Sequence, residues 1–527
     1  TEHGNNHQGV NIGKAALDDL LARSGAPGGV VVHVGCGDGE GSISLAKQRD
    51  TYVVQGLDAH TEALDGARQR ARMIGLAGRL SFKHWDGGRL PYADGLVNVL
   101  FWQKPDDDPD MEEILRVLAP YGTAYIQQDA GWRKVSKPWS GDIDEWTHFR
   151  YDAGNTGGSK DTRVGPPKHI QWETGPRFMR SHEIETGLSS IVSAKGRIYY
   201  ILDEGPLGIT DARFPAKWSL ICRDAFNGVL LWKRPMPNWG WRAWNAQRVN
   251  TPSSWLATRH HSSAEVDRLM VAGGDTLYVT LGFGSPISAL DGATGEVIMT
   301  YEQTAGMLEC IFIDGFLITR RNHPTPTITA TRAGDGEMLW QREADMIVDR
   351  SLCAAGGRVF FHTRHSLVAI DLATGDELWR HETELRPSAL IAHQDAVLAV
   401  QSSLTLALST RTGEELWRGP GAGIRGRNPD LFVIGDHVYW RRGRCEARHI
   451  KTGAVVKQLE LQQVLKSGHH RRCFTDKASA NYMITGQRGS EFLDLHDNNH
   501  KRHNWFRGPC LTGIMPANGL FYVPPHQ

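Results

Sequence analysis

Cysteine is scarce in this chain of 527 residues, and its seven cysteines are scattered. The sequence contains no Cys-x-x-Cys and no Cys-x-x-Cys-His, which argues against a zinc ribbon and against covalently bound haem. We therefore expect no metal site. Cys473 and Cys510 could form a disulfide if the protein is exported, and buried free thiols are the alternative.

Long apolar runs and an excess of one charge are also absent. The 59 basic residues balance the 59 acidic residues, which gives no whole-chain attraction to nucleic acid or to membranes. No apolar run approaches the roughly 20 residues needed to span a bilayer. The apolar content of 40% is ordinary for a globular protein, and the length exceeds what one hydrophobic core organises, so we expect two domains.

The sequence is rich in one repeated phrase. Each copy reads as a strand, a tight turn with a glycine that tolerates positive φ, and a second strand that in most copies ends in tryptophan. Five segments carry the phrase: Cys222–Trp232, Ala289–Gly295, Ala330–Trp340, Ala369–Trp379 and Ala407–Trp417.

The glycines of the phrase recur at a nearly constant spacing. The steps are 41, 39, 38 and 40 residues along the series Gly295, Gly336, Gly375, Gly413 and Gly453. A period near 40 residues with short strands is typical of the four-stranded blades of a β-propeller. A tryptophan at a constant offset can lay its ring against the neighbouring blade. Because Met299 and Lys457 replace it in two copies, we expect looser contacts there.

The phrase Ala-x-Asp-x-x-Thr-Gly-x-x-x-Trp is similar to the tryptophan-docking repeat of quinoprotein alcohol dehydrogenase-like (PQQ-like) propellers. The resemblance implies an all-β propeller fold. Several quinone-dependent dehydrogenases of this fold carry vicinal cysteines, and this sequence has neither these nor an obvious set of calcium-binding carboxylates. The resemblance therefore argues for the fold and against pyrroloquinoline quinone (PQQ) as a cofactor.

Counting the copies predicts the number of blades. Six glycine-centred copies and a degenerate seventh, Glu491–Trp505, give seven blades. His169–Glu173 fits a last strand supplied early, and Cys510–Tyr522 fits the opening strands of an eighth blade. We therefore expect an eight-bladed ring closed by its own first strand. On that count the chain stops at Gln527 about one strand short, which predicts a missing C-terminal segment or a partner chain.

Residues 1–130 have a different pattern. The apolar segment Val30–Val34 is followed by a glycine-rich turn, Gly35–Gly41, and by a helical stretch, Ser42–Gln48. Such a turn lets backbone N–H groups at a helix start approach a nucleotide. A second strand ends at Asp58, whose carboxylate can accept both hydroxyls of a ribose. Further strands are expected near 80–86, 96–101 and 122–127, and a helix near 111–118.

This order of elements resembles a class I S-adenosyl-L-methionine (SAM)-dependent methyltransferase, which has an α/β Rossmann-like fold. The resemblance implies that the methionine end is held by Gly35, Gly37, Asp38 and Gly39, the ribose by Asp58, and the adenine by Trp85 and Asp86. The usual final helix and antiparallel hairpin are not evident after residue 127, so the sequence supports cofactor binding better than methyl transfer. NAD is the alternative cofactor, because Asp58 suits either ribose.

Residues 131–168 join the two parts. They are rich in aromatic and ion-pairing residues rather than in glycine and serine, so we expect a docked linker. We then expect the propeller to span residues 169–527, with an incomplete last blade. The whole arrangement resembles exported bacterial proteins that fuse a methyltransferase-like domain to a PQQ-like propeller, which implies a periplasmic or otherwise exported protein. A cytoplasmic location is the alternative, because SAM is made in the cytosol.

Loops of the propeller carry many cationic and imidazole side chains, as at Arg320–His323 and Asp349–Arg350. These lie at a similar phase of the repeat, so we expect them to converge at one mouth of the central channel. Arginine suits carboxylate and sulfate, and histidine transfers protons near neutral pH. The candidate catalytic residues are Arg180, His182, His323, Arg425, His469 and Arg471. Solvated charges on different faces are the alternative.

Aromatic and amide side chains add a hint about the ligand. The insertion Trp239–Asn250 combines three tryptophans with Arg, Asn and Gln, a set that suits a sugar ring, although packing between blades is a competing use. We therefore predict an enzyme that acts on an anionic carbohydrate or similar small anionic ligand at the propeller mouth, with a nucleotide-type cofactor in the first domain. The alternative is a binding or assembly scaffold with a vestigial methyltransferase domain.

Overall fold

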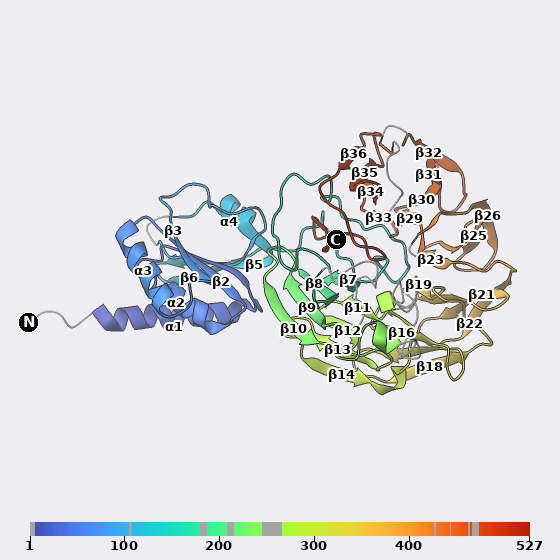
Figure 1. Ribbon diagram of the computed structural model, residues 1–527, viewed down its shortest axis with the longest axis horizontal. Coiled ribbons are helices and arrows are strands. Elements are labelled where there is room, and N and C mark those ends of the chain that lie inside the picture. Colours follow the sequence, from blue (N-terminus) through green and yellow to red (C-terminus); the bar gives the residue numbers. More distant parts are fainter. Residues whose placement is uncertain are drawn as a thin grey trace, which may run out of the picture. The chain divides into compact units, whose positions relative to one another are not determined.

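The computed structural model describes residues 6–104, 108–179, 187–207, 215–244, 266–425, 428–442, 444–461, 464–465 and 474–526. The chain forms two compact units (Figure 1). The first consists of Thr1–Gly141, His169–Thr174 and Cys222–Lys233, and the second of Asp142–Lys168, Gly175–Ile221 and Arg234–Gln527. None of the described helices is long and apolar enough to cross a membrane.

A six-stranded sheet in the order β3-β2-β1-β4-β5-β6 forms the centre of the first unit. The strands are β1 Gly29–Val34, β2 Tyr52–Asp58, β3 Leu80–His84, β4 Val97–Trp102, β5 Leu118–Gln128 and β6 Gly131–Ser136. The first five are parallel to their neighbours, and β6 is antiparallel to β5. The expectation that no antiparallel hairpin follows residue 127 is therefore wrong, because a turn at 129–130 reverses the chain onto β5.

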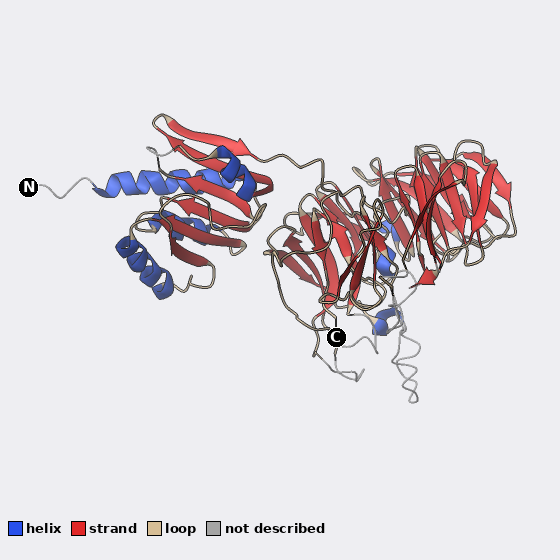
Figure 2. Ribbon diagram, turned by 90° about the horizontal axis from the view of Figure 1, so that it is seen from above, coloured by secondary structure: helices blue, strands red, loops and turns tan. Residues whose placement is uncertain are grey.

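Helices accompany this sheet on both sides, as Figure 2 shows. They are α1 Asn6–Ser24, α2 Glu40–Gln48, α3 Thr61–Met73 and α4 Met111–Val117. Successive residues of a strand point to opposite faces, and the core divides accordingly. On β1, Val31 joins one buried cluster, whereas Val32 and Val34 join the other. Parallel sheets covered on both faces need such continuously apolar strands.

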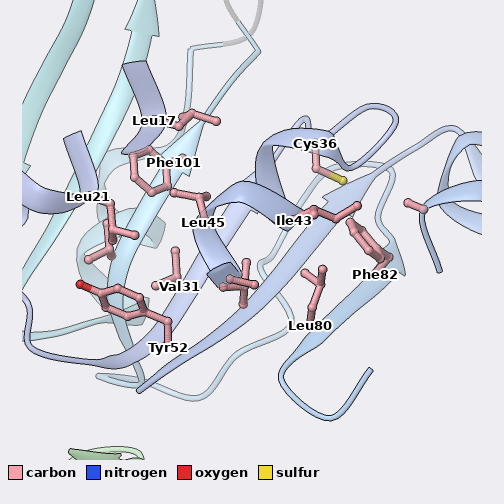
Figure 3. Close-up of a cluster of buried hydrophobic side chains, with 14 of the residues drawn as sticks. Leu17, Leu21, Val31, Cys36, Ile43, Leu45, Tyr52, Leu80, Phe82 and Phe101 are labelled. Atoms are coloured by element: carbon pink, nitrogen blue, oxygen red, sulfur yellow. The ribbon is translucent and has the colours of Figure 1, made fainter. Parts of the chain in front are cut away.

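Figure 3 shows the first of these clusters. Leu17 of α1 and Ile43 of α2 pack with Leu80 and Phe82 of β3. Cys36, from the glycine-rich turn, lies in the same buried group. Burial raises the pKa of the Cys36 thiol to about 12, so this thiol acts as a small apolar side chain that anchors the turn to the core.

Seven four-stranded sheets surround a common axis and form a β-propeller (Figure 1). In each sheet the strands pair in chain order. Blades one to three are β7 Leu188–Ala194, β8 Arg197–Asp203, β9 Trp218–Asp224, β10 Leu230–Pro235; β11 Met270–Gly273, β12 Thr276–Thr280, β13 Ile287–Asp291, β14 Val297–Tyr301; and β15 Glu309–Ile313, β16 Phe316–Arg321, β17 Thr327–Arg332, β18 Met338–Glu343. Short helices α5 Trp241–Trp244, η3 Val266–Arg268 and η4 Glu302–Thr304 lie between strands of this part.

The remaining blades follow the same order. Blades four to seven are β19 Cys353–Ala355, β20 Arg358–His362, β21 Ser366–Asp371, β22 Glu377–Glu382; β23 Ala389–His393, β24 Ala396–Val400, β25 Leu404–Ser409, β26 Glu415–Pro420; β29 Leu431–Ile434, β30 His437–Arg442, β31 Arg444–His449, β32 Val455–Leu459; and β33 Lys477–Ala478, β34 Tyr482–Thr485, β35 Ser490–Asp494, β36 Lys501–His503. Two hairpins complete the set: β27 Ile424–Arg425 with β28 Asn428–Pro429, and β37 Met515–Ala517 with β38 Leu520–Tyr522.

The predicted ring of eight blades is not found, because seven four-stranded sheets form the ring in the described part of the chain. The predicted opening strands of an eighth blade are present as the hairpin β37–β38. The predicted last strand, His169–Glu173, is not formed. Prolines at 166, 167 and 176 flank that segment and cannot donate to a ladder. Its Trp172 instead donates from Nε1 to the carbonyl of Ala225 at 3.0 Å.

Each repeated phrase forms the turn between the third and fourth strands of a blade. In blade four, Asp371 accepts hydrogen bonds from the backbone N–H groups of Ala373 and Thr374, each at 2.9 Å. Gly375 completes the turn with a φ of 72°. A Cβ added to this glycine would lie 2.6 Å from the ring of Trp340 in the preceding blade. Glycine is thus required both by the backbone angle and by the close approach of the indole.

The indoles of the phrase contact the following blade. Nε1 of Trp340 donates to the carbonyl of Leu372 at 2.9 Å, and Nε1 of Trp379 donates to the carbonyl of Thr410 at 3.0 Å. All the indole rings of this series are largely buried. Trp340 and Trp379 therefore each join two sheets through apolar contact and one hydrogen bond to the backbone.

The linker runs around the propeller axis. Residues 144–157, which we call the hub, accept one hydrogen bond from the innermost strand of every blade in chain order and one from the hairpin β37–β38. The hydrogen bonds, each from a backbone N–H group, are Asn518 to Asp144 O, Ser193 to Trp146 O, Ala272 to Thr147 O, Phe312 to His148 Nε2, Ala354 to Ala153 O, Ala392 to Gly154 O, Val433 to Thr156 O and Ala478 to Gly157 O. The hub is thus an integral part of the propeller.

Candidate functional site

The carboxyl ends of three neighbouring parallel strands bring the predicted cofactor residues of the first unit together. Gly35 follows β1, Asp58 ends β2, and Trp85 comes directly after β3. The strand order reverses between β1 and β4, and open α/β sheets bind ligands beyond the carboxyl ends of the strands at such a point.

The three glycines of the turn have different roles. Gly35, Gly37 and Gly39 have φ values of 75°, 53° and 81°. A Cβ on Gly35 would lie 2.4 Å from the carbonyl oxygen of Gln103, and one on Gly39 would lie 2.7 Å from Phe82. A Cβ on Gly37 would have no atom within 4 Å. Packing therefore requires the outer two glycines, whereas the middle one borders open space.

Asp58 is tied to this turn. Its Oδ2 accepts a hydrogen bond from the backbone N–H of Gly37 at 2.8 Å. Its Oδ1 accepts from the backbone N–H of His60 at 3.0 Å and lies 2.8 Å from His60 Nδ1. Burial works to raise the pKa of Asp58, but these hydrogen bonds outweigh it and lower the pKa below its usual value. The carboxylate is thus ionised at neutral pH and keeps lone pairs for further donors.

The remaining predicted cofactor residues differ in exposure. Asp38 and Asp86 are exposed, and Asp38 accepts a hydrogen bond from the backbone N–H of Glu40 at the start of α2. Trp85 is mostly buried. Its ring meets Trp102 edge to face at 5.7 Å, and the Lys104 ammonium lies 5.3 Å from its centroid. Only a small part of the Trp85 ring is therefore open to a ligand.

Residues after β4 were not predicted from the sequence. Gln103 Oε1 lies 2.7 Å from His33 Nε2, and His33 Nδ1 lies 2.9 Å from the hydroxyl of Ser42 on α2. Burial lowers the pKa of His33 to about 4, so the imidazole is neutral and bridges β1, β4 and α2. Gln103 and Lys104 could have been predicted from their position directly after a buried strand, which is how Asp58 was recognised.

This edge of the sheet fits a nucleoside. It combines an ionised carboxylate at the end of β2, a glycine with open space in front of it, and the start of a helix at Glu40. Carboxylate and helix start are the groups that hold ribose and the polar end of such cofactors in Rossmann-like folds.

Few of the predicted catalytic residues of the propeller lie in the described part of the chain. Arg180, His182, His469 and Arg471 lie outside the described residues. His323 is exposed, one residue beyond Asn322. Arg425 lies in β27, and its side chain lies outside the described part.

A different set of charged residues does converge. Glu309, fully buried at the start of β15, accepts from Nη1 of Arg268 at 2.6 Å and from Nε of Arg320 at 3.1 Å. Nη1 of Arg320 also donates to the Asn322 amide oxygen at 2.9 Å and forms an ion pair with Oδ1 of Asp349 at 3.1 Å. We call Arg268, Glu309, Arg320, Asn322 and Asp349 the mouth cluster.

The mouth cluster lies at the beginning of the innermost strands. Arg268 immediately precedes blade two, and Glu309 opens blade three. Nη2 of Arg268 donates to the side chain of Asn428 at 3.1 Å, and Asn428 belongs to the hairpin that precedes blade six. Because blades two and six are well separated around the ring, this hydrogen bond crosses the axis. The hub, in contrast, contacts the innermost strands near their ends.

Two tryptophans of the insertion, Trp239 and Trp244, belong to an aromatic group. Trp244 meets Trp218, Trp239 and Phe283 with ring centroids 6.0, 6.0 and 6.2 Å apart. Nε1 of Trp239 donates to the hydroxyl of Ser189 at 3.2 Å. These contacts are packing contacts, the competing use that the sequence indicated for the tryptophans. Residues 245–265 of the insertion and the following loop lie outside the described part.

Neither a disulfide nor a metal site is assigned. Cys473 lies outside the described residues, so its expected pairing with Cys510 stays a prediction. Within the part of the chain that the structure describes, no three histidine, cysteine, aspartate or glutamate side chains gather as metal ligands would.

Comparison with known proteins gives separate matches for the two parts. Residues 31–122 match the family described as "Methyltransferase domain", and residues 219–459 match the family described as "Outer membrane protein assembly factor BamB". A stretch of 123 residues is 37% identical to the methyltransferase GfsG of Streptomyces halstedii and covers 22% of this chain. The chain spans only 44% of the length of that relative.

Some solved structures are similar to one part of the chain. BamB from Moraxella catarrhalis is 15% identical with a TM-score of 0.37, covering 63% of this chain and 88% of its own. Geranyl diphosphate C-methyltransferase from Streptomyces coelicolor A3(2) is 19% identical with a TM-score of 0.20, covering 22% of this chain and 45% of its own. The chain thus combines an N-terminal methyltransferase-like α/β domain with a BamB-like, PQQ-like β-propeller.

Proposed function

We propose that the first unit binds SAM and transfers its methyl group to a small-molecule acceptor. The observation that carries this proposal is the ionised Asp58, hydrogen-bonded to the glycine turn at the carboxyl edge of the sheet, within the residues that match a methyltransferase domain. When bound, SAM supplies a methyl group activated by a sulfonium. The residues of the chain bind and orient it.

Each residue of this edge has a defined task in the proposal. Asp58 accepts hydrogen bonds from the ribose hydroxyls, for which its low pKa and remaining lone pairs suit it. Gly37 leaves room for the ligand to approach the backbone. The neutral His33 holds Gln103 and α2 in register and carries no proton to the cofactor.

The acceptor is proposed to be an anionic carbohydrate or a similar small anion that the propeller binds. The support is the mouth cluster, in which two guanidinium groups share one buried carboxylate. A propeller that serves only as a binding or assembly scaffold is the second candidate, and the burial of Arg268 and Arg320 favours it. An exported location, with a cytoplasmic one as alternative, belongs to the proposal as well.

Calorimetric titration of SAM into the full chain tests the cofactor. We expect binding to the wild-type protein and at least a tenfold loss for Asp58→Ala. Asp65→Ala is the control, because Asp65 is an exposed partner of Arg68 on α3. Equal affinity of Asp58→Ala and wild type would contradict the assignment of the ribose site. Titration with NAD in place of SAM decides between the two cofactors.

Methyl transfer is tested separately. Incubation of the protein with SAM and a panel of uronic acids, followed by mass spectrometry, should show a product heavier by one CH₂ group. Unchanged SAM and unchanged sugars, in a protein that binds SAM, would favour the scaffold candidate.

A further inference from the structure

The mouth cluster has an unbalanced charge at its centre. Arg268 and Arg320 are buried and share the single carboxylate of Glu309. The three groups together carry one positive charge. A buried charge needs a partner, and in this cluster the compensating carboxylate is that of Asp349, at 3.1 Å from Nη1 of Arg320.

The partner that balances this charge is held loosely. The Asp349 side chain is 57% exposed, whereas that of Arg320 is 0% exposed. Oδ1 of Asp349 lies 3.1 Å from Nη1 of Arg320 in an ion pair. A carboxylate on arginine is held best by two parallel hydrogen bonds, and solvent around the exposed carboxylate screens the attraction.

Both guanidinium groups also have unused donors. Nη2 of Arg320 and Nε of Arg268 are buried and have no hydrogen-bond partner in the described part of the structure. Leaving a buried N–H group of a charged side chain unpaired is costly. An oxyanion seated against Nη1 and Nη2 of Arg320 would satisfy the unused donor of that arginine and replace the contact of Asp349.

We propose that Arg320, with Arg268 behind it, is the anion-binding site of the propeller, and that Asp349 is an internal carboxylate which the ligand displaces. The ligand is a small molecule that carries a carboxylate, in the proposed case a sugar acid. This inference rests on the proposed function for the anionic class of the ligand. It adds the atoms that bind the anion and a built-in competitor that lowers affinity for weak anions.

Calorimetric titration of D-glucuronate into the full chain tests the site. Asp349→Asn removes the competing charge from an exposed position, so the fold should be retained, and we expect glucuronate to bind at least tenfold more tightly than to wild type. Neutral D-glucose should not gain affinity. Asp335→Asn is the matched control, because Asp335 pairs with the exposed Arg332 in the same blade, and it should leave glucuronate binding unchanged.

A double variant, Arg320→Met with Asp349→Asn, should lose the gained affinity. If Asp349→Asn binds glucuronate no better than wild type, or if Asp335→Asn gains as much, the inference is wrong. SAM titration of the same variants separates the two proposals. Normal SAM binding without any gain for glucuronate overturns only the site described here, whereas a gain for glucuronate in a protein that does not bind SAM overturns only the methyltransferase proposal.

Discussion

The ammonium of Lys457 donates a hydrogen bond to the carbonyl of Leu495 at 2.8 Å, as the indole N–H of Trp417 does to the carbonyl of Ile450 at 2.7 Å one blade earlier. Both donors stand four residues after the glycine of their repeat. The lysine therefore keeps the hydrogen bond between the blades but lacks the apolar packing of an indole ring.

Substitutions of Lys457 test the hydrogen bond and the apolar packing separately. Lys457→Leu leaves the Leu495 carbonyl without its donor and should lower the free energy of unfolding by about 1 kcal/mol. Lys457→Trp restores the indole of the repeat and should be at least as stable as wild type. Urea denaturation followed by fluorescence measures both, with Lys451→Leu, on the exposed turn of the same blade, as the control. Equal stability of Lys457→Leu and wild type would show that the hydrogen bond contributes nothing.

Trp379 joins blade four to blade five, so its removal opens a cavity between them. We expect Trp379→Ala to lower the free energy of unfolding by about 3 to 5 kcal/mol, the range for large-to-small substitutions in cores. Leu378→Ala, at the exposed neighbouring position, should have a small effect. A loss below about 1 kcal/mol for Trp379→Ala would mean that this indole does not support the contact between blades.

Arg150 holds the hub in place. Its guanidinium donates to the carbonyl oxygens of Asn155, Pro429 and Leu431 at 3.1, 2.8 and 2.7 Å, and it is buried. Arg150→Met would leave three buried acceptors unpaired, so we expect a loss of about 3 kcal/mol or more in the free energy of unfolding. Arg163→Met, in the same linker but half exposed, is the control. Thermal unfolding at the same midpoint for wild type and Arg150→Met would disprove this role of the hub.

His148 makes the stability of the hub depend on pH. Its Nε2 accepts the backbone N–H of Phe312 at 3.0 Å, and burial lowers its pKa from 6.5 to about 3. Below pH 6.5 the unfolded chain binds a proton at this residue and the folded chain does not. Stability is therefore complete above pH 6.5 and is lost as the pH falls towards 3, by about 1.4 kcal/mol per unit.

His148→Gln, whose amide oxygen can accept the same hydrogen bond, should remove this contribution. Urea denaturation at pH 7.5 and pH 5 should show a smaller loss for the variant than for wild type. The exposed His323→Gln serves as the comparison and should behave as wild type does. The same loss in His148→Gln and wild type would exclude His148 as the titrating group.

Local patterns in the sequence predicted much of the architecture. The Asp-x-x-Thr-Gly turn is a local structure, since Asp371 caps its own turn and Gly375 supplies the required φ. The glycine turn and Asp58 were likewise recognisable because strand, turn and strand end follow one another in a short stretch. The sequence therefore predicted the blade hairpins, the methyltransferase-like fold and the cofactor edge.

The mouth cluster could be predicted only in part, because Arg320 and Asp349 belong to the loops expected to converge, whereas Arg268 and Glu309 do not. Arg268, Glu309 and Asp349 lie on three successive segments without a shared motif, and Arg320 enters through a strand end. Of the predicted catalytic loop residues, only His323 has a described side chain, and it is exposed. Whether side chains from different blades meet depends on the direction of each strand end. The repeat period does not determine that direction.

The sequence by itself determined the repeat, its glycine-hinged turns, the indoles between blades and the glycine turn of the first unit, because these depend on backbone angles and on contacts between neighbouring segments of the chain. Only the tertiary structure decided that seven blades are complete, that the linker becomes a hub touching all of them, and that two arginines share Glu309. Those features depend on ring closure, which brings together residues far apart in the chain.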